Sequence, residues 1–163
     1  MIPEIKNILY TTDLSDNAVH AFSYAAVLAN RFAAKISIVH VIEELSHSSN
    51  VQIAQMIGED KWRAVQAQNV QKIRDTIAGR LDAFCKEMKT ELKECPFIVE
   101  KVIVEKGTPV KAILRQAETL KSDMIVMGTH GQGVVADALM GSTARRVVRR
   151  SALPVLTIRL PKA

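Results

Sequence analysis

The sequence predicts an α/β fold built on an open parallel sheet. Short apolar runs alternate with longer stretches whose apolar residues recur at helical spacing, from one end of the chain to the other. This alternation is typical of β-α-β units, in which right-handed crossovers place helices on both faces of a parallel sheet. Five apolar runs of strand length occur, so we expect a sheet of five strands.

The composition suits one domain covering residues 1–163. Hydrophobic residues make up 48% of the chain and charged residues 24%, which is ordinary for a globular protein with a sizeable core. No linker, internal repeat or low-complexity tract divides the sequence. We therefore expect a single structural unit.

Several features predict a cytoplasmic protein. No apolar run approaches the length of a membrane span, and residues 1–13 lack the apolar core of a signal peptide. Cys85 and Cys95 have no metal-ligand spacing. We expect them to be neutral thiols rather than a disulfide, which agrees with a reducing compartment.

The net charge of +5 raises the question of nucleic acid. The basic residues are spread along the chain, and their densest cluster lies on one predicted helix, where a solvated face explains it. Aromatic residues are only 4% of the chain, so stacking platforms for single strands are absent. Nucleic acid is therefore not expected as a partner. The cluster consists of Arg145, Arg146, Arg149 and Arg150.

Each predicted strand is a short apolar run bounded by turn residues. The second run is rich in β-branched residues, the third is closed by Glu105-Lys106-Gly107, and the fourth ends on Gly128. Pro154 in the last run suits the start of a strand or an edge position. The strands are expected at Ile5–Thr11, Lys35–Ile42, Phe97–Val104, Asp123–Met127 and Leu153–Ile158.

The first predicted helix follows the first strand directly. Ser15 can cap a helix from Asp16 to Arg31. The serine-rich segment Glu43–Asn50 is polar and is expected to be a surface loop. The apolar stripe of the first helix consists of Ala18, Ala21, Phe22, Ala25, Ala26 and Leu28.

A long helix is expected from Ile53 to Leu92, although Gly58 and Gly79 weaken the pattern. Thr108 and Pro109 suit the cap and first position of the next helix, which ends near Leu120. A last, basic helix begins where Ser142 can cap it. The face of the long helix that meets the sheet consists of Ile73, Ile77, Leu81, Phe84 and Met88.

A glycine-rich stretch, Met127–Ser142, joins the fourth strand to the basic helix. Glycines permit positive φ and close backbone approach, so successive N–H groups can converge on an anion. The first free N–H groups of a helix add partial positive charge. The stretch therefore predicts an anion site at a strand–helix junction. Its glycines are Gly128, Gly131, Gly133 and Gly141.

The expected strand order is 3-2-1-4-5, a Rossmann-like arrangement. Ligands of open parallel sheets bind beyond the carboxyl ends of the strands, where the strand order reverses. This crevice would lie between the first and fourth strands. Asp13 leaves the first strand there and Gly128 leaves the fourth, so the two should face each other.

Two common nucleotide motifs do not fit this stretch. The P-loop pattern requires a lysine before its serine or threonine, and the stretch contains none. Residues 131–136 have the form G-x-G-x-x-A, but a dinucleotide site needs an acidic residue on a following strand. Nothing acidic occurs after Asp137.

A third motif fits closely. Gly128-x2-Gly131-x9-Gly141-Ser142 resembles the nucleotide-binding signature of the universal stress protein family, in its ATP-binding branch. The resemblance extends over the whole chain through ILYTTDLS, HVIEE, the Gly107-Thr108-Pro109 turn, DMIVMGTHG and the closing SALPVLTIR.

The resemblance implies a set of residues that bind ATP. Asp13 would lie near the adenosine, the backbone of Val41 would read the adenine edge, and Mg²⁺ or Mn²⁺ would be held mainly by the phosphates. Met127 and Gly128 would lie near the ribose. The last four residues of the implied set would hold the phosphates. The set is Thr11, Thr12, Asp13, Val41, Met127, Gly128, Gly131, Gly141, Ser142 and Thr143.

Simpler roles exist for several of these residues. Asp13 could brace the turn after the first strand, and Gly128 and Gly131 could be turn glycines only. His130 could contact phosphate or act as a base, but we interpret it as a loop residue facing solvent. We expect His40 to be a satisfied histidine of the sheet.

Three functions remain open on the sequence. The favoured one is a stress-response module that binds ATP, has no catalytic residue and acts through partner proteins. The second is a slow ATPase or a nucleotidyl or phosphoryl transferase, for which His130 and the arginines are the only candidates. The third is an interaction protein that binds no nucleotide. The family resemblance also implies a homodimer, paired through the last strand.

Overall fold

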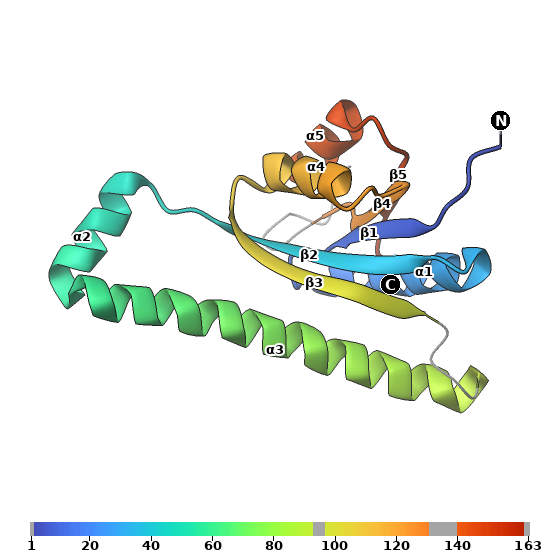
Figure 1. The fold of residues 1–163 in the computed structure, drawn as a ribbon, viewed down its shortest axis with the longest axis horizontal. Helices are drawn as coiled ribbons and strands as arrows, with labels where there is room; N and C mark the ends of the chain where they lie inside the picture. Colours follow the sequence, from blue (N-terminus) through green and yellow to red (C-terminus); the bar gives the residue numbers. More distant parts are fainter. Residues whose placement is uncertain (1, 93–96, 131–139, 162–163) are drawn as a thin grey trace.

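The computed structural model describes residues 2–92, 97–130 and 140–161. Its five strands form one parallel sheet in the order β3-β2-β1-β4-β5 (Figure 1). The prediction of an open parallel sheet in this order is confirmed. The strands are β1 (Asn7–Thr11), β2 (Lys35–Glu43), β3 (Ile98–Gly107), β4 (Met124–Gly128) and β5 (Val155–Ile158).

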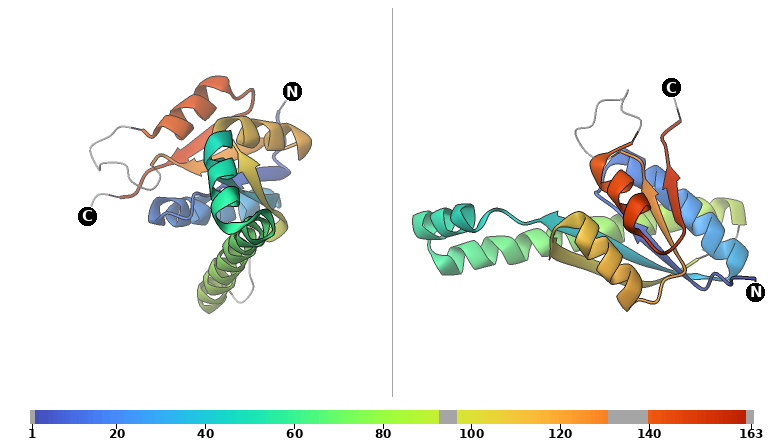
Figure 2. Two further views of the ribbon diagram at one scale, coloured as in Figure 1. Left: turned by 90° about the vertical axis from the view of Figure 1, so that its left-hand side faces the viewer. Right: turned by 90° about the horizontal axis from the view of Figure 1, so that it is seen from above.

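Helices cover both faces of the sheet, as expected. Helices α1 and α3 lie on one face and α4 and α5 on the other, which the end view of Figure 2 shows. Each pair of helices buries its own cluster of apolar side chains against the sheet. The helices are α1 (Asp16–Phe32), α2 (His47–Ile57), α3 (Glu59–Leu92), α4 (Pro109–Thr119) and α5 (Ser142–Arg150).

Strand β1 separates the two apolar clusters. Ile8 and Tyr10 point to the α1 and α3 face, whereas Leu9 points to the α4 and α5 face. This alternation follows from the two-residue period of a strand. Because β1 is covered on both sides, its apolar run is nearly continuous, as in other buried parallel strands.

Helix α1 packs closely on the sheet because its buried face is made of small side chains. Ser15 is the predicted cap, and its hydroxyl accepts a hydrogen bond from the Ala18 N–H at 3.2 Å. Phe22 is the one large apolar residue of this face and stacks edge-on against Tyr10. The small residues are Ala18, Ala21, Ala25, Ala26 and Ala29.

The prediction of a surface loop at Glu43–Asn50, after β2, is partly wrong. Helix α2 begins at His47, within that segment, and the Ser46 hydroxyl accepts a hydrogen bond from the Ser49 N–H at 3.1 Å. A serine-rich run is compatible with a loop or with a helix cap, so its composition cannot separate the two. Gly58, at φ 93°, ends α2, and α3 starts after it.

Helices α2 and α3 form a hairpin that extends beyond the sheet (Figures 1 and 2). No residue of α2 is buried. On α3, Ile77 is buried against the sheet, as its place in the predicted stripe indicates. Across the described part of the chain, no helix combines the length and hydropathy that a membrane span requires.

Two further expectations are wrong. The Glu105–Gly107 segment is not a turn but the end of β3, because it continues to pair with Val41–Glu43 of β2. Cys85 is disulfide-bonded rather than a neutral thiol. Cys95 lies outside the described residues. Cysteine pairing depends on Cα distances in the folded chain, which residue spacing alone does not provide.

Tyr10 has a titration that folding perturbs. Its hydroxyl donates a hydrogen bond to the Ala18 carbonyl oxygen at 2.5 Å in the buried core. Burial disfavours the phenolate and raises the pKa of Tyr10 to about 12. The folded state therefore holds this proton more tightly than the unfolded state.

We predict an alkaline loss of stability that depends on Tyr10. Its contribution should be complete below the unfolded pKa of about 10 and should disappear as the pH rises toward the folded value, a loss of roughly 2–3 kcal/mol. Tyr10→Phe should lack this component in urea unfolding measured across that pH window. Tyr24→Phe is the control at an exposed tyrosine and should keep the wild-type dependence of the free energy of unfolding on pH. A wild-type slope in Tyr10→Phe would contradict the prediction.

Candidate functional site

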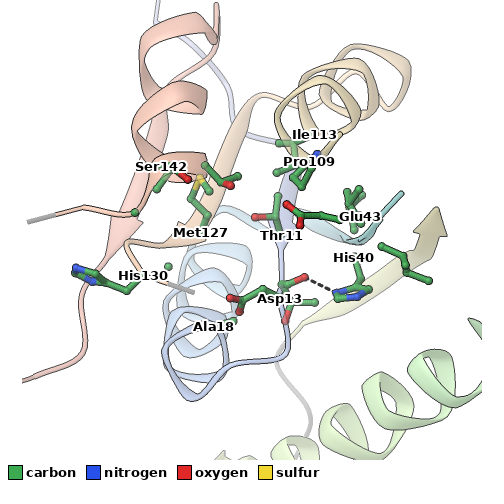
Figure 3. A pocket seen from close by; sticks show the side chains of 18 of the residues that line it. Thr11, Asp13, Ala18, His40, Glu43, Pro109, Ile113, Met127, His130 and Ser142 are labelled. Atoms are coloured by element: carbon green, nitrogen blue, oxygen red, sulfur yellow. Dashed lines mark hydrogen bonds between the residues drawn. The ribbon is translucent and has the colours of Figure 1, made fainter. Parts of the chain in front are cut away.

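A cavity of about 590 Å³ opens at the carboxyl ends of β1, β2 and β4 (Figure 3). Its walls come from the β1–α1 turn, the end of β2, the end of β4 and the first turn of α5, with α3 and α4 at the sides. This is the place where the strand order reverses, as expected for a ligand site in a parallel sheet. Its volume lies in the range of small-molecule sites.

Every predicted site residue that the structure describes lines this cavity. Residues that are distant in sequence, such as Asp13 and Gly128, lie at one opening because their strands are neighbours. Gly131 and Gly133 lie outside the described residues. The binding roles of the set stay predictions. The lining residues among them are Thr11, Thr12, Asp13, Val41, Met127, Gly128, Gly141, Ser142 and Thr143.

The turn after β1 is held by short-range hydrogen bonds. The Asp13 carboxylate accepts from both the N–H and the hydroxyl of Ser15, at 3.0 and 2.5 Å. Leu14 adopts φ 67°, which is costly for a branched side chain. Its carbonyl accepts from the Arg80 guanidinium at 2.9 Å. Asp13 therefore braces this turn and stands at the cavity wall.

The end of β2 forms the opposite wall. His40 Nδ1 lies 2.8 Å from the Thr12 carbonyl oxygen, and the Thr12 N–H donates to the Val39 carbonyl at 3.0 Å. A carbonyl oxygen only accepts, so Nδ1 carries the proton of this bond. The prediction of a satisfied sheet histidine is confirmed. The same contacts hold the cavity ends of β1 and β2 together.

The junction of β4 with α5 is closed by backbone hydrogen bonds. The Thr129 N–H donates to Ile158 O at 2.8 Å, and the Gly141 N–H donates to Thr129 O at 2.7 Å. Gly141, not Ser142, is the N-cap of α5, and among the described residues no side-chain cap hydrogen bond forms at this helix start. The predicted cap role of Ser142 is therefore wrong, because the helix starts one residue earlier.

The first turn of α5 faces the cavity. Ser142, Thr143 and Ala144 all line it. The N–H groups at a helix start have no intrahelical acceptor and carry partial positive charge. Such N–H groups at a helix start are suited to an anionic ligand. The two hydroxyls add further hydrogen-bond donors.

The wall residues from helices α3 and α4 were not identified as site residues from the sequence. Asn69 and Ile73 come from α3, and Pro109 and Ile113 come from the start of α4. Ile73 belongs to the predicted apolar stripe, but helical spacing does not show which part of a stripe borders a cavity. A second cavity, of about 780 Å³, runs along the α2–α3 hairpin and shares Asn69 with the first.

Of the candidate catalytic groups, His130 lines the described cavity and the arginines of α5 do not. The His130 imidazole points away from Asp13 in Figure 3, and its Nδ1 lies 2.8 Å from the Thr129 hydroxyl. The arginines of α5 are exposed, and the cavity wall does not include them. No cluster of His, Cys, Asp or Glu suited to a metal ion occurs within the described ranges.

Comparison with known proteins agrees with the fold. Residues 4–159 match the model of the Universal stress protein family. The chain belongs to this family.

Relatives within the universal stress protein family are similar along nearly the whole chain. A universal stress protein of Methanocaldococcus jannaschii is 28% identical over 94% of both chains. A putative universal stress protein of Staphylococcus aureus is 33% identical over 94% of this chain and 84% of its own. The similarity therefore covers every strand of the sheet.

Solved structures show the same architecture. The structure of the archaeal relative matches with a TM-score of 0.75 at 24% identity, covering 99% of this chain and 100% of its own. A universal stress protein of Archaeoglobus fulgidus, solved in complex with dAMP, matches with a TM-score of 0.60 at 18% identity, covering 97% and 99%. At these identities the likeness establishes the fold.

Gly128 offers a test of how tightly α1 packs against the end of β4. A Cβ added at this residue would lie 2.5 Å from Asn17 Nδ2 and 3.1 Å from Asn17 Cγ. Gly128→Ala should therefore lower the free energy of unfolding by about 1–3 kcal/mol. Gly79→Ala is the matched control, since no atom lies within 4 Å of its added Cβ. Urea unfolding should show the control unchanged or stabilised by up to about 1 kcal/mol. Equal stability of the two variants would contradict this packing.

Proposed function

We propose that this protein binds ATP in the cavity at the β1–β4 switch point and acts as a nucleotide-dependent stress-response module. The observation that carries the proposal is the start of α5, which lines the same cavity as Asp13 and Val41. An anion site and a nucleoside-sized space thus share one opening. The dAMP complex of the Archaeoglobus relative supports an adenine nucleotide as the ligand class.

The wall suggests how the nucleotide lies. Adenine would occupy the apolar end formed by Val39, Val41 and Ile113, with the Val41 backbone reading its edge. The ribose would lie by Asp13, Met127 and Gly128, and Thr11 and Thr12 would flank it. The phosphates would meet Gly141, Ser142 and Thr143 at the start of α5, and Gly131 of the same signature.

A divalent ion would be held mainly by the phosphates. Mg²⁺ and Mn²⁺ prefer oxygen ligands and are commonly bound through substrate phosphates with few protein carboxylates. Asp13 and Glu43 are the carboxylates of the described wall, and both lie on the β1 and β2 side. We therefore infer that Mg²⁺ or Mn²⁺ enters with ATP rather than occupying a site of its own.

We further propose a homodimer paired through β5. This strand is an edge of the sheet, and an edge strand presents unpaired N–H and C=O groups to a second copy. Leu160, just beyond it, is exposed. Thr157→Pro, which removes one donor from the strand, should shift the mass measured by light scattering toward the monomer. An unchanged dimer would exclude β5 as the interface.

ATP should stabilise the fold in proportion to its occupancy. At a ligand concentration of about one hundred times Kd, the free energy of unfolding rises by about 2.7 kcal/mol, and a thermal melt detects this readily as a higher melting temperature. Gly141→Val should abolish the shift, because a Cβ at Gly141 would lie 3.0 Å from Thr129 O and press against the junction. Gly79→Ala should keep it. No shift for the wild type at millimolar ATP with Mg²⁺ would refute the binding function.

The same protein tests the alternative of a slow ATPase or transferase. We expect phosphate release at the buffer background, because the described wall of the cavity carries no lysine or arginine to stabilise the charge that develops at the γ-phosphate. Release above background that disappears in Ser142→Ala or His130→Ala would instead assign turnover to this site.

A further inference from the structure

Asn17 is a buried polar residue in the first turn of α1. Its exposed fraction is 4%, and its neighbours on the buried face of the helix are alanines. The described wall of the cavity does not include Asn17, although Ala18, the next residue, belongs to it. Asn17 therefore lies behind the site rather than in it.

The side chain of Asn17 spans the gap between α1 and the residues that follow β4. Its Nδ2 donates a hydrogen bond to the His130 carbonyl oxygen at 2.8 Å. The same Nδ2 lies 2.5 Å from the place that a Cβ of residue 128 would occupy, so only glycine permits this approach. Asn17 thus contacts both Gly128 and His130, at the start of the glycine-rich stretch.

The other end of the Asn17 amide has no partner. Its Oδ1 is buried and makes no hydrogen bond to any described residue. An apolar side chain would avoid this unsatisfied acceptor, so the amide is a costly choice for a core position. The amide orientation is determined by His130 O, which accepts only and must face the NH₂ group. The hydrogen bond to His130 is thus what the amide contributes.

We propose that Asn17 is a positioning residue for the phosphate side of the site. Its amide holds the carbonyl group of His130, which belongs to the glycine-rich stretch Met127–Ser142. Thr129, one residue earlier, is tied to Ile158 and to Gly141, the N-cap of α5. Losing the Asn17 bond would let this junction move relative to the start of α5. The nucleoside side, formed by β1 and β2, would keep its own contacts. This role rests on the proposed binding of ATP.

The decisive variant is Asn17→Asp, which keeps the shape of the side chain. A carboxylate only accepts hydrogen bonds, so it would face the His130 carbonyl without a donor. ATP affinity measured by calorimetry should fall about tenfold, whereas adenosine affinity should change by less than about twofold. Asn17→Leu, whose side chain has the same number and branching of heavy atoms, removes the donor without adding charge and should give the same selectivity loss. Asn30→Asp makes the same change at an exposed residue of α1 and is the matched control.

The outcomes separate the two levels of the proposal. A wild-type protein that binds neither ATP nor adenosine would remove the binding function and this inference together. A wild type that binds both, with Asn17 variants that lose both affinities in parallel, would overturn the positioning role alone. Unchanged ATP affinity in the Asn17 variants would also overturn the positioning role. Failure of both variants to fold would overturn it too, because Asn17 would then serve the core only.

Discussion

The pairing of β1 with β4 at the centre of the sheet is the constraint on which the site depends. The two strands are parallel neighbours, with Leu9 opposite Ile125. From β1 the chain crosses to β2 on one side, and from β4 it crosses to β5 on the other. Because the two crossovers use opposite faces and lead in opposite directions, their first turns separate and leave a cavity between them. Asp123 secures the pairing, since its carboxylate accepts from the Lys6 and Asn7 N–H groups at 2.8 Å each.

Helix α1 connects the stability of the core to the geometry of the cavity. Its small buried residues let it lie close to β1 and β4, and this closeness lets Asn17 reach His130. The close approach in turn requires glycine at residue 128. Gly128, the first glycine of the signature, is therefore required for the packing of α1, and it also lines the cavity. Gly128 is the last residue of β4 and does not adopt positive φ, so close packing rather than a turn explains this glycine.

Fold class and strand order could be predicted because they follow from local patterns. Apolar runs of strand length, helical stripes and the Ser15 cap each depend on residues that are near in sequence. The errors arose where one local pattern permits two structures. The run around Ser46 suits a loop or a cap, and the end of β3 contains the charged residues typical of a turn. In both cases a neighbouring element decided the outcome.

For the site, the sequence by itself determined which residues belong to the glycine signature and which strand ends carry them. The residues of β1, β2 and β4 meet because parallel strands place their carboxyl ends at one edge. Only the tertiary structure decided the rest: the walls from α3 and α4, the cap of α5 at Gly141, and the bond from Asn17 to His130. These depend on how helices pack across the sheet, and packing joins side chains more than a hundred residues apart without any trace in their local spacing.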